Sequence, residues 1–368
     1  MPRLRRIISF LLVVLASSLM ILTCSCSQPS GNIEPTDNAG MAAETEQPIQ
    51  PTAVAGNVPF VDSEGYVEFG VNDDLSKLPQ MEAVNVKIDV STENLDAFKT
   101  AVLPDGCEML DLVFAPEGID NSLDMSDLTA SDSLIAINIT VSNCGKLVMP
   151  DAKNTGTLNV SGNFDELDAS GLSALDLLNI DGDSCGKLTL PPSVTNIITS
   201  CALDISMLSG LSALERLSIS GSTDLSPLSE ISCVKYLTLR GGGWDLAPLA
   251  ESGIISLNIN QSEGIDIADI NKLTKLETLQ LSDNVNGDIS PILAHPSLKR
   301  LLIYVADTEN NQRSILSLAF GTPINKENIS LLDGDIDCAI SVDDLRAFIN
   351  NGGELYFLRD ITRLWGLS

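Results

Sequence analysis

The chain has a single histidine, His295, as the one imidazole that could act as a general base near neutral pH. A hydrolase built on it would need a serine and a carboxylate beside the ring, and the spacing in the surrounding segment AHPSL indicates no such triad. The segment RGGGW (Arg240–Trp244) lacks the Gly-Lys-Ser/Thr ending of a phosphate-binding loop and predicts a turn. We therefore expect a structural or solvated histidine and a chain that is not an enzyme.

The acidic segment Asp333–Asp344 has oxygen-bearing side chains at the spacing of an EF-hand calcium loop. Loop positions 1, 3, 5, 9 and 12 are Asp333, Asp335, Asp337, Ser341 and Asp344. Position six, normally a glycine that makes a sharp turn, is Cys338. The same segment also fits a strand followed by a helix that Ser341 caps. We expect this second arrangement and no bound cofactor, with calcium as the alternative.

The composition is strongly acidic, because 50 Asp and Glu face 21 Lys and Arg in 368 residues, for a net charge of -29. Binding a nucleic acid requires a cationic surface that releases counterions from the phosphates, so this charge argues against a nucleic-acid partner. An acidic surface instead favours solubility and attracts cations or basic partners. Hydrophobic residues make up 44% of the chain, which is enough to form a folded core.

Residues 1–26 have the features of an export signal. The basic start MPRLRR precedes an apolar run, Ile7–Leu22, which is shorter than the roughly 20 residues that a spanning helix needs. The following segment TCSC is similar to a bacterial lipoprotein signal, in which a cysteine behind a small residue is lipidated. Cys26 fits this pattern best, with Cys24 as the alternative site. An ordinary signal peptide is the competing interpretation.

Residues 27–59 are rich in Pro, Gln, Thr, Glu and Ala and have no apolar periodicity, which predicts a disordered linker. A flexible chain of this length holds its two ends roughly 30 Å apart. Signal and linker together predict a domain that is exported and attached by lipid to the bacterial cell membrane or cell surface.

A short apolar phrase, Leu-x-Leu, recurs through most of the chain. Its first residue falls at Ile137, Leu158, Leu178, Ile197, Leu217, Leu237, Leu257, Leu279 and Leu301. The spacings lie between 19 and 22 residues, and a fixed period of this length is the sequence signature of a solenoid. A second phrase, such as LDISML (Leu203–Leu208) or GDISPI (Gly287–Ile292), marks the return leg of the coil. Its aspartate can cap a short helical turn, and proline is tolerated in the first turn.

The combination of these phrases over about residues 80–305 resembles leucine-rich-repeat proteins, in particular the internalin-like bacterial branch. The resemblance implies an α/β solenoid: a leucine-rich-repeat horseshoe with a parallel concave sheet and a short helical or irregular convex side. It also implies recognition of a protein ligand. Physically, one coil cannot bury its own leucines, and stacking the coils creates a continuous core.

The period predicts the organisation of the rest of the chain. We place the leucine-rich-repeat solenoid at residues 110–305, an N-terminal capping flank at 60–109 and a C-terminal capping region at 306–368. The segments Val90–Phe114 and Ile340–Leu358 share one pattern, a capped helix followed by a strand, and we expect both to close open ends of the solenoid.

The cysteines outside the lipoprotein signal show no Cys-x-x-Cys spacing, so we expect no zinc cluster. Cys144 and Cys185 occupy equivalent places in the phrases CGKLVMP and CGKLTLP, 41 residues and therefore two coils apart. Two strand spacings amount to about 10 Å, which exceeds the Cα separation of about 7 Å that a disulfide can bridge. Although export permits disulfides, we expect free, buried thiols.

Side chains on either side of each Leu-x-Leu leucine should face the inside of the curve, because residues of a strand alternate between its two faces. In the later repeats arginine and tyrosine are concentrated at these positions, among small polar residues. The predicted ligand-binding residues are Arg216, Tyr236, Arg240, Asn258, Asn260, Gln280, Arg300 and Tyr304. Tyrosine and arginine are favoured anchors of protein interfaces.

The sequence therefore predicts a non-enzymatic, lipid-anchored surface protein that binds an extracellular protein or glycan through its concave face. One alternative is a structural spacer of the cell envelope. Another is a calcium-dependent assembly module.

Overall fold

The structure is a computed structural model, and it describes residues 59–359 except 60, 64, 115–121, 222, 242, 261–266, 282–289, 306–322 and 333–340. The predicted signal peptide with Cys24 and Cys26, nearly all of the predicted linker, and Asp333, Asp335 and Asp337 lie outside the described residues.

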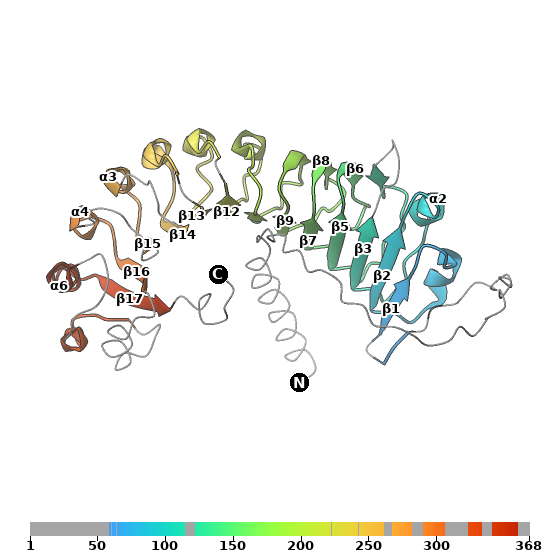
Figure 1. Cartoon of the computed structure of the whole chain (residues 1–368), viewed down its shortest axis with the longest axis horizontal. Helices are drawn as coiled ribbons and strands as arrows, with labels where there is room; N and C mark the ends of the chain where they lie inside the picture. Colours follow the sequence, from blue (N-terminus) through green and yellow to red (C-terminus); the bar gives the residue numbers. More distant parts are fainter. Residues whose placement is uncertain are drawn as a thin grey trace, which may run out of the picture. The chain divides into compact units, whose positions relative to one another are not determined.

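Thirteen strands form one parallel sheet in the described part of the chain, and each strand pairs with the one contributed by the next coil. The strands lie on the inner side of the curve that the coils describe (Figure 1). In order they are β1 (Tyr66–Phe69), β2 (Asn85–Val90), β3 (Met109–Phe114), β5 (Ala136–Val141), β7 (Thr157–Ser161), β9 (Leu177–Asp181), β11 (Asn196–Thr199), β12 (Arg216–Ser220), β13 (Tyr236–Arg240), β14 (Ser256–Asn260), β15 (Thr278–Leu281), β16 (Arg300–Val305) and β17 (Glu354–Arg359).

The leucines of the repeated phrase are aligned across this sheet. Leu217, Leu237, Leu257, Leu279 and Leu301 are register partners in successive strands, and each is at most 1% exposed. Alternate residues of a strand point to opposite faces, so one face of the sheet builds the core and the other is free. The predicted leucine-rich-repeat solenoid with a parallel concave sheet is confirmed.

The coil stack extends beyond the predicted start of the solenoid at residue 110. Val67 of β1 is aligned with Val86 of β2, and Val86 with Leu110 of β3, so segment 60–109 adds strands to the same sheet. At the other end, helix α6 (Val342–Asn350) is capped by Ser341 and followed by β17, which is the predicted order of helix and strand.

Most return legs form short helical turns on the outer side (Figure 1). Besides α6 they are η1 (Leu75–Gln80), α2 (Leu95–Lys99), η2 (Ile205–Leu208), η3 (Ser226–Ser229), η4 (Ala247–Glu251), α3 (Ile267–Ile270), α4 (Ser290–Leu293) and η5 (Ile329–Leu331). The carboxylates of Asp204, Asp224 and Asp245 accept a hydrogen bond from the backbone N–H two residues later, at 2.9 to 3.0 Å. The predicted capping role is confirmed for Asp204, the N-cap of η2. Asp224 and Asp245 lie one residue before the N-caps of η3 and η4, which are Leu225 and Leu246 and make no side-chain cap hydrogen bond. None of the described helices is long and apolar enough to cross a membrane.

Four return legs differ from the expected helical turns and form a second parallel sheet. Its strands are β4 (Leu123–Asp124), β6 (Cys144–Val148), β8 (Phe164–Asp168) and β10 (Cys185–Thr189), in the order β10-β8-β6-β4. The phrase CGKL accounts for part of this difference. A Cβ atom on Gly186 would lie 1.7 Å from the carbonyl oxygen of Asp165, so the close approach of β10 to β8 requires glycine there.

Replacing Gly186 with alanine should therefore destabilise the protein by about 1–3 kcal/mol, because β10 and β8 must separate to admit the methyl group. Gly210→Ala is the matched control, since a Cβ atom at Gly210 meets nothing within 4 Å. We expect the control to change the free energy of unfolding by at most about 1 kcal/mol. Urea unfolding followed by circular dichroism measures both. Equal midpoints for the two variants would contradict the close packing of β10 on β8.

Candidate functional site

The predicted binding residues of β12–β15, with Arg300 of β16, form neighbouring rows on the sheet face opposite the leucines. The first row contains Arg216, Tyr236, Ser256, Thr278 and Arg300; the second Ser218, Thr238, Asn258, Gln280 and Leu302; the third Ser220, Arg240 and Asn260. We call Arg216, Tyr236, Arg240, Asn258 and Asn260 the arginine–tyrosine surface. Tyr304 lies in β16 opposite Leu358 of β17, and its side chain lies outside what the structure describes.

Arg216 and Tyr236 form a cation–π pair. Because β12 and β13 align these two residues, the guanidinium carbon of Arg216 lies 4.0 Å from the centre of the Tyr236 ring. Such a contact orients the arginine without neutralising its charge, and it contributes about 0.5–1 kcal/mol at an exposed site. The pair therefore presents a positive charge and an aromatic edge to the open side of the sheet.

Arg240 is half-buried, and its guanidinium makes no hydrogen bond or ion pair with any described residue. It ends β13, and the turn that follows has Gly241 and Gly243 at φ values of 88° and 79°. The indole N–H of Trp244 donates to the Gly241 carbonyl at 2.8 Å and fixes this turn. Burial lowers the pKa of the Arg240 guanidinium. An arginine stays protonated in proteins regardless, so the site holds a partly desolvated charge that has no counter-ion among the described groups.

Two polar atoms next to Arg240 also lack partners. The side-chain oxygens of Ser218 and Asn258 are buried, and neither has a hydrogen-bond partner in the described part of the chain. They lie on either side of Thr238 in the second row. A ligand or solvent molecule that approaches this row could satisfy both groups, since buried polar atoms are rarely left without a partner.

Arg300 differs from the other two arginines because its charge is already neutralised. Its Nε atom lies 3.3 Å from Oε2 of Glu354, and the Tyr356 hydroxyl donates to the same oxygen at 3.2 Å. We did not predict Glu354 and Tyr356 as concave residues, because the repeat period is lost after residue 305. The alternation of buried Leu355 and Phe357 with these polar residues is the signal that could have identified them.

Several polar groups in the N-terminal half of the concave face bond to one another, although the side-chain oxygen of Asn179 is buried without a partner among the described residues. Asn159 donates its amide hydrogen to Asn138 Oδ1 at 2.7 Å, and Asn138 in turn donates to the carboxylate of Asp111. Burial raises the pKa of the Asp111 carboxyl. Lys87 is paired with Glu68 on the neighbouring strand. The available positive charge on the described concave face is therefore concentrated at Arg216 and Arg240.

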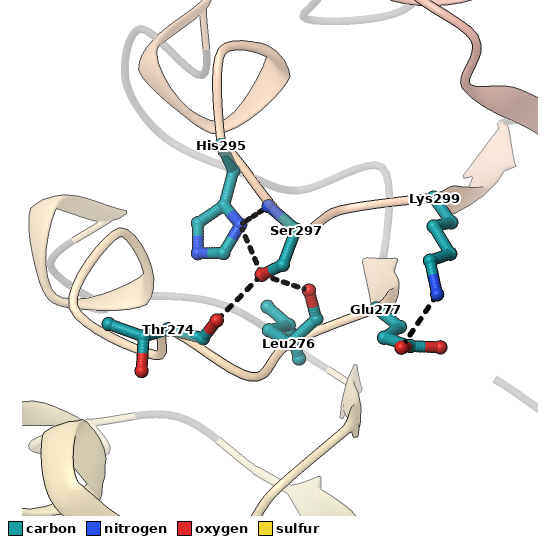
Figure 2. Close-up of polar contacts among 6 residues, drawn as sticks. All are labelled: Thr274, Leu276, Glu277, His295, Ser297 and Lys299. Atoms are coloured by element: carbon teal, nitrogen blue, oxygen red, sulfur yellow. Dashed lines mark hydrogen bonds and ion pairs between the residues drawn. The ribbon is translucent and has the colours of Figure 1, made fainter.

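His295 lies on the convex side and takes part in a turn rather than a catalytic arrangement (Figure 2). Its ring is 6% exposed, and Nδ1 lies 3.3 Å from the Ser297 hydroxyl. That hydroxyl is 2.9 Å from the carbonyl oxygens of both Thr274 and Leu276, which it links to the next coil. The nearby Glu277 is paired with Lys299 at 2.7 Å. Among the described residues no carboxylate orients the imidazole as a triad requires.

The described part of the proposed calcium loop is used in capping α6. The backbone N–H of Asp344 donates to Ser341 Oγ at 3.1 Å, and Ser341 Oγ donates to Asp344 Oδ2 at 2.6 Å. The Ser341 hydroxyl thereby satisfies one of the free N–H groups at the start of α6, as an N-cap side chain does. No cluster of three metal-binding side chains occurs among the residues that the structure describes. The other three predicted ligands lie outside them, so the calcium site stays a prediction.

Burial lowers the pKa of His295, and the stability of the protein should depend on pH accordingly. The unfolded chain binds a proton near the ordinary histidine pKa of about 6.5, whereas the folded chain binds it only at lower pH. The free energy of unfolding should therefore fall as the pH is lowered from about 7 to 5.5. In His295→Leu this slope should be smaller, whereas Ser297→Ala should keep it. Urea midpoints at several pH values measure the slopes, and identical slopes for His295→Leu and the wild type would contradict the assignment.

Comparison with known proteins adds little to this geometry. No protein-family model matches the chain, and no curated protein gives a match. Among solved structures the chain is similar to internalin C2 (inlC2) of Listeria monocytogenes, with 20% identity over 54% of this chain and 81% of that one, at a TM-score of 0.30. It is also similar to an internalin (inlF) of the same organism, with 18% identity over 66% of this chain and 87% of that one, at a TM-score of 0.28. At these scores the likeness carries no argument, and the assignment of the fold depends on the strand register and the leucine core described above.

Proposed function

We propose that this chain is an exported, lipid-anchored binding protein whose concave sheet recognises a protein partner through the arginine–tyrosine surface. The observation that carries the proposal is Arg240, a half-buried arginine with no counter-ion among the described groups in a protein of net charge -29. A carboxylate supplied by a partner would provide the missing ion pair.

The charge arrangement favours an acidic patch on the partner. Arg240 is already partly desolvated in the free protein, so binding removes less water from it than from an exposed arginine. Arg216 is held by Tyr236, which lowers the entropy lost when a ligand contacts it. Arginine and tyrosine together are the residues that most often dominate the binding energy of protein interfaces. The surrounding acidity disfavours partners that place negative charge elsewhere, which contributes specificity.

The proposed anchor is the lipidated N-terminus at Cys26, with Cys24 as the alternative, followed by the linker of residues 27–59. A lipid-modified N-terminus with a flexible tether of roughly 30 Å would leave the concave face free to meet a partner outside the cell. Mass spectrometry of the N-terminal peptide of the mature protein would show whether a cysteine starts the chain and carries lipid.

A spacer function is the second candidate, and a specific observation favours it. In the N-terminal half of the concave face the side chains of Asp111, Asn138 and Asn159 bond to one another, which makes these groups less available to a ligand. If the arginine–tyrosine surface also binds no ligand, the solenoid serves as a structural spacer of the cell envelope.

We predict that Arg240→Ala weakens binding of the protein partner at least tenfold, and that the double variant Arg216→Ala/Tyr236→Ala does the same. The partner is first captured from extracellular proteins by the mature chain, and the dissociation constants of the variants are then measured. Arg300→Ala is the matched control, because this arginine is on the same face but already paired with Glu354. We expect it to change affinity less than about threefold.

The salt dependence gives a second measure of the same proposal. Binding of the wild type should weaken as ionic strength rises, and Arg240→Ala should show a smaller dependence. Equal affinity of all four proteins would exclude the arginine–tyrosine surface as the binding site, and a captured glycan instead of a protein would contradict the partner class.

A further inference from the structure

Two cysteines in successive coils meet at the open edge of the second sheet. Strand β10 is the last strand of that sheet, because the next coil returns through the helical turn η2 instead of a strand. Pairing continues past β10 only as a single bridge between Ser184 and Ala202 among the described residues. Cys185 follows the first residue of this bridge, and Cys201 precedes the second. The two thiols therefore lie where the strand-type and the helical return legs join.

The contacts of the two sulfur atoms place them close together. Cys185 Sγ donates to the carbonyl oxygen of Ala202 at 3.5 Å, which directs it toward the backbone next to Cys201. Cys201 Sγ lies 2.8 Å from Thr199 Oγ1, and the two thiols influence one another's pKa more than any other group does. Both cysteines are free in this structure.

The other cysteines provide an internal comparison. Cys144 occupies the same place as Cys185 in the CGKL phrase, yet both cysteines are aligned with Phe164 of β8 from opposite sides. The phenylalanine therefore separates them, as we predicted from their spacing. Cys233 Sγ donates to the Leu211 carbonyl at 3.3 Å, farther along the solenoid. Among the described cysteines, Cys185 and Cys201 are the pair that the fold brings together.

We propose that Cys185 and Cys201 form a disulfide in the exported protein, which joins two coils covalently and protects the edge of the second sheet. An open sheet edge presents unpaired backbone groups to other chains, and exported proteins commonly contain disulfides because no reducing system removes them. The bond would close a loop over residues 186–200. This proposal depends on export and is independent of what the concave face binds.

The two residues have complementary properties for thiol–disulfide exchange. The hydrogen bond from the Cys185 thiol, together with that from Thr199, lowers the pKa of the Cys201 thiol to about 7. The same hydrogen bond, together with burial, raises the pKa of the Cys185 thiol, so the thiolate, which is the nucleophilic form, is favoured at Cys201 over Cys185. Cys185 is partly exposed, whereas Cys201 is 2% exposed. An external oxidant consequently reaches Cys185 first.

The oxidation is a balanced two-step exchange with an external disulfide, such as glutathione disulfide or an oxidised dithiol protein. Cys185 transfers its proton to the neighbouring Cys201 thiolate, attacks the external disulfide and forms a mixed disulfide, and the thiolate released from the oxidant takes that proton from Cys201 and leaves as a thiol. The Cys201 thiolate then attacks the Cys185 sulfur, which forms the Cys185–Cys201 bond and releases the second thiol. The two protein thiols lose two electrons and two protons in total, and the oxidant gains them.

The test uses the mature full-length chain equilibrated with excess glutathione disulfide at pH 7.5. Free thiols are then alkylated in denaturant and the peptides are mapped without reduction. We expect a cross-linked peptide that contains Cys185 and Cys201, with Cys107, Cys144 and Cys233 alkylated. Full alkylation of Cys185 and Cys201, or pairing of either one with a different cysteine, would overturn the proposal.

A thermal measurement with matched variants tests the same bond in the folded protein. Reduction of the oxidised wild type should lower the melting temperature by about 5 °C, since a loop of this length is no longer closed. Cys144→Ser, which alters the equivalent position two coils away, should keep both the cross-link and this difference. Cys185→Ser and Cys201→Ser should each lose both. If reduction lowered the melting temperature of Cys185→Ser by the same amount as that of the wild type, another disulfide would be responsible.

Discussion

Stacking of coils at the strand spacing is the constraint on which the rest of this protein depends. Each coil contributes two inward apolar residues to the main sheet, far too few to exclude water alone, and the core exists only because Leu237 lies between Leu217 and Leu257 in register. A shift of one residue in one strand would turn its leucines to the open face. The register therefore fixes, at the same time, the core and the identity of every side chain on the concave surface.

The return legs can adopt more conformations than the strands. Each return leg needs only to connect one strand to the next and to bury some apolar residues. Two solutions coexist: helical turns capped by aspartate, and strands that pair into a second sheet. The paired strands require glycine at position 186, where the backbone of β10 lies against that of its parallel neighbour β8. In the same region Asn163 Oδ1 accepts hydrogen bonds from the backbone N–H groups of Asp183 and Ser184, which ties one coil to the next where the helical turns are absent. The two solutions meet at Cys185 and Cys201, so the weakest pairing on the convex side is where a covalent bond would contribute most.

Much of this architecture follows from the sequence because the repeat period is the length of one coil. A spacing near twenty residues predicts the sheet, and the alternation around each leucine predicts the exposed rows. The capping role of Asp204 was predictable for the same reason, since an aspartate before a short turn can accept a local backbone hydrogen bond. The second sheet was not predictable, because backbone approach at Gly186 depends on contacts between coils. Pairing of Arg300 with Glu354 was missed because 53 residues separate them, and the segment between them lacks the repeat.

The charges of the concave face show why residue type alone does not define a binding site. Arg216, Arg240 and Arg300 all flank the repeated leucines on the concave face, yet a cation–π contact holds the first, no described group pairs with the second, and a carboxylate pairs with the third. An ion pair on the free surface lowers the gain from any new partner, because it must be broken or shared when the ligand arrives. In an acidic chain most cations find such a partner. The arginine that does not, and that is also half-buried, is the one whose interaction energy is still available to a ligand.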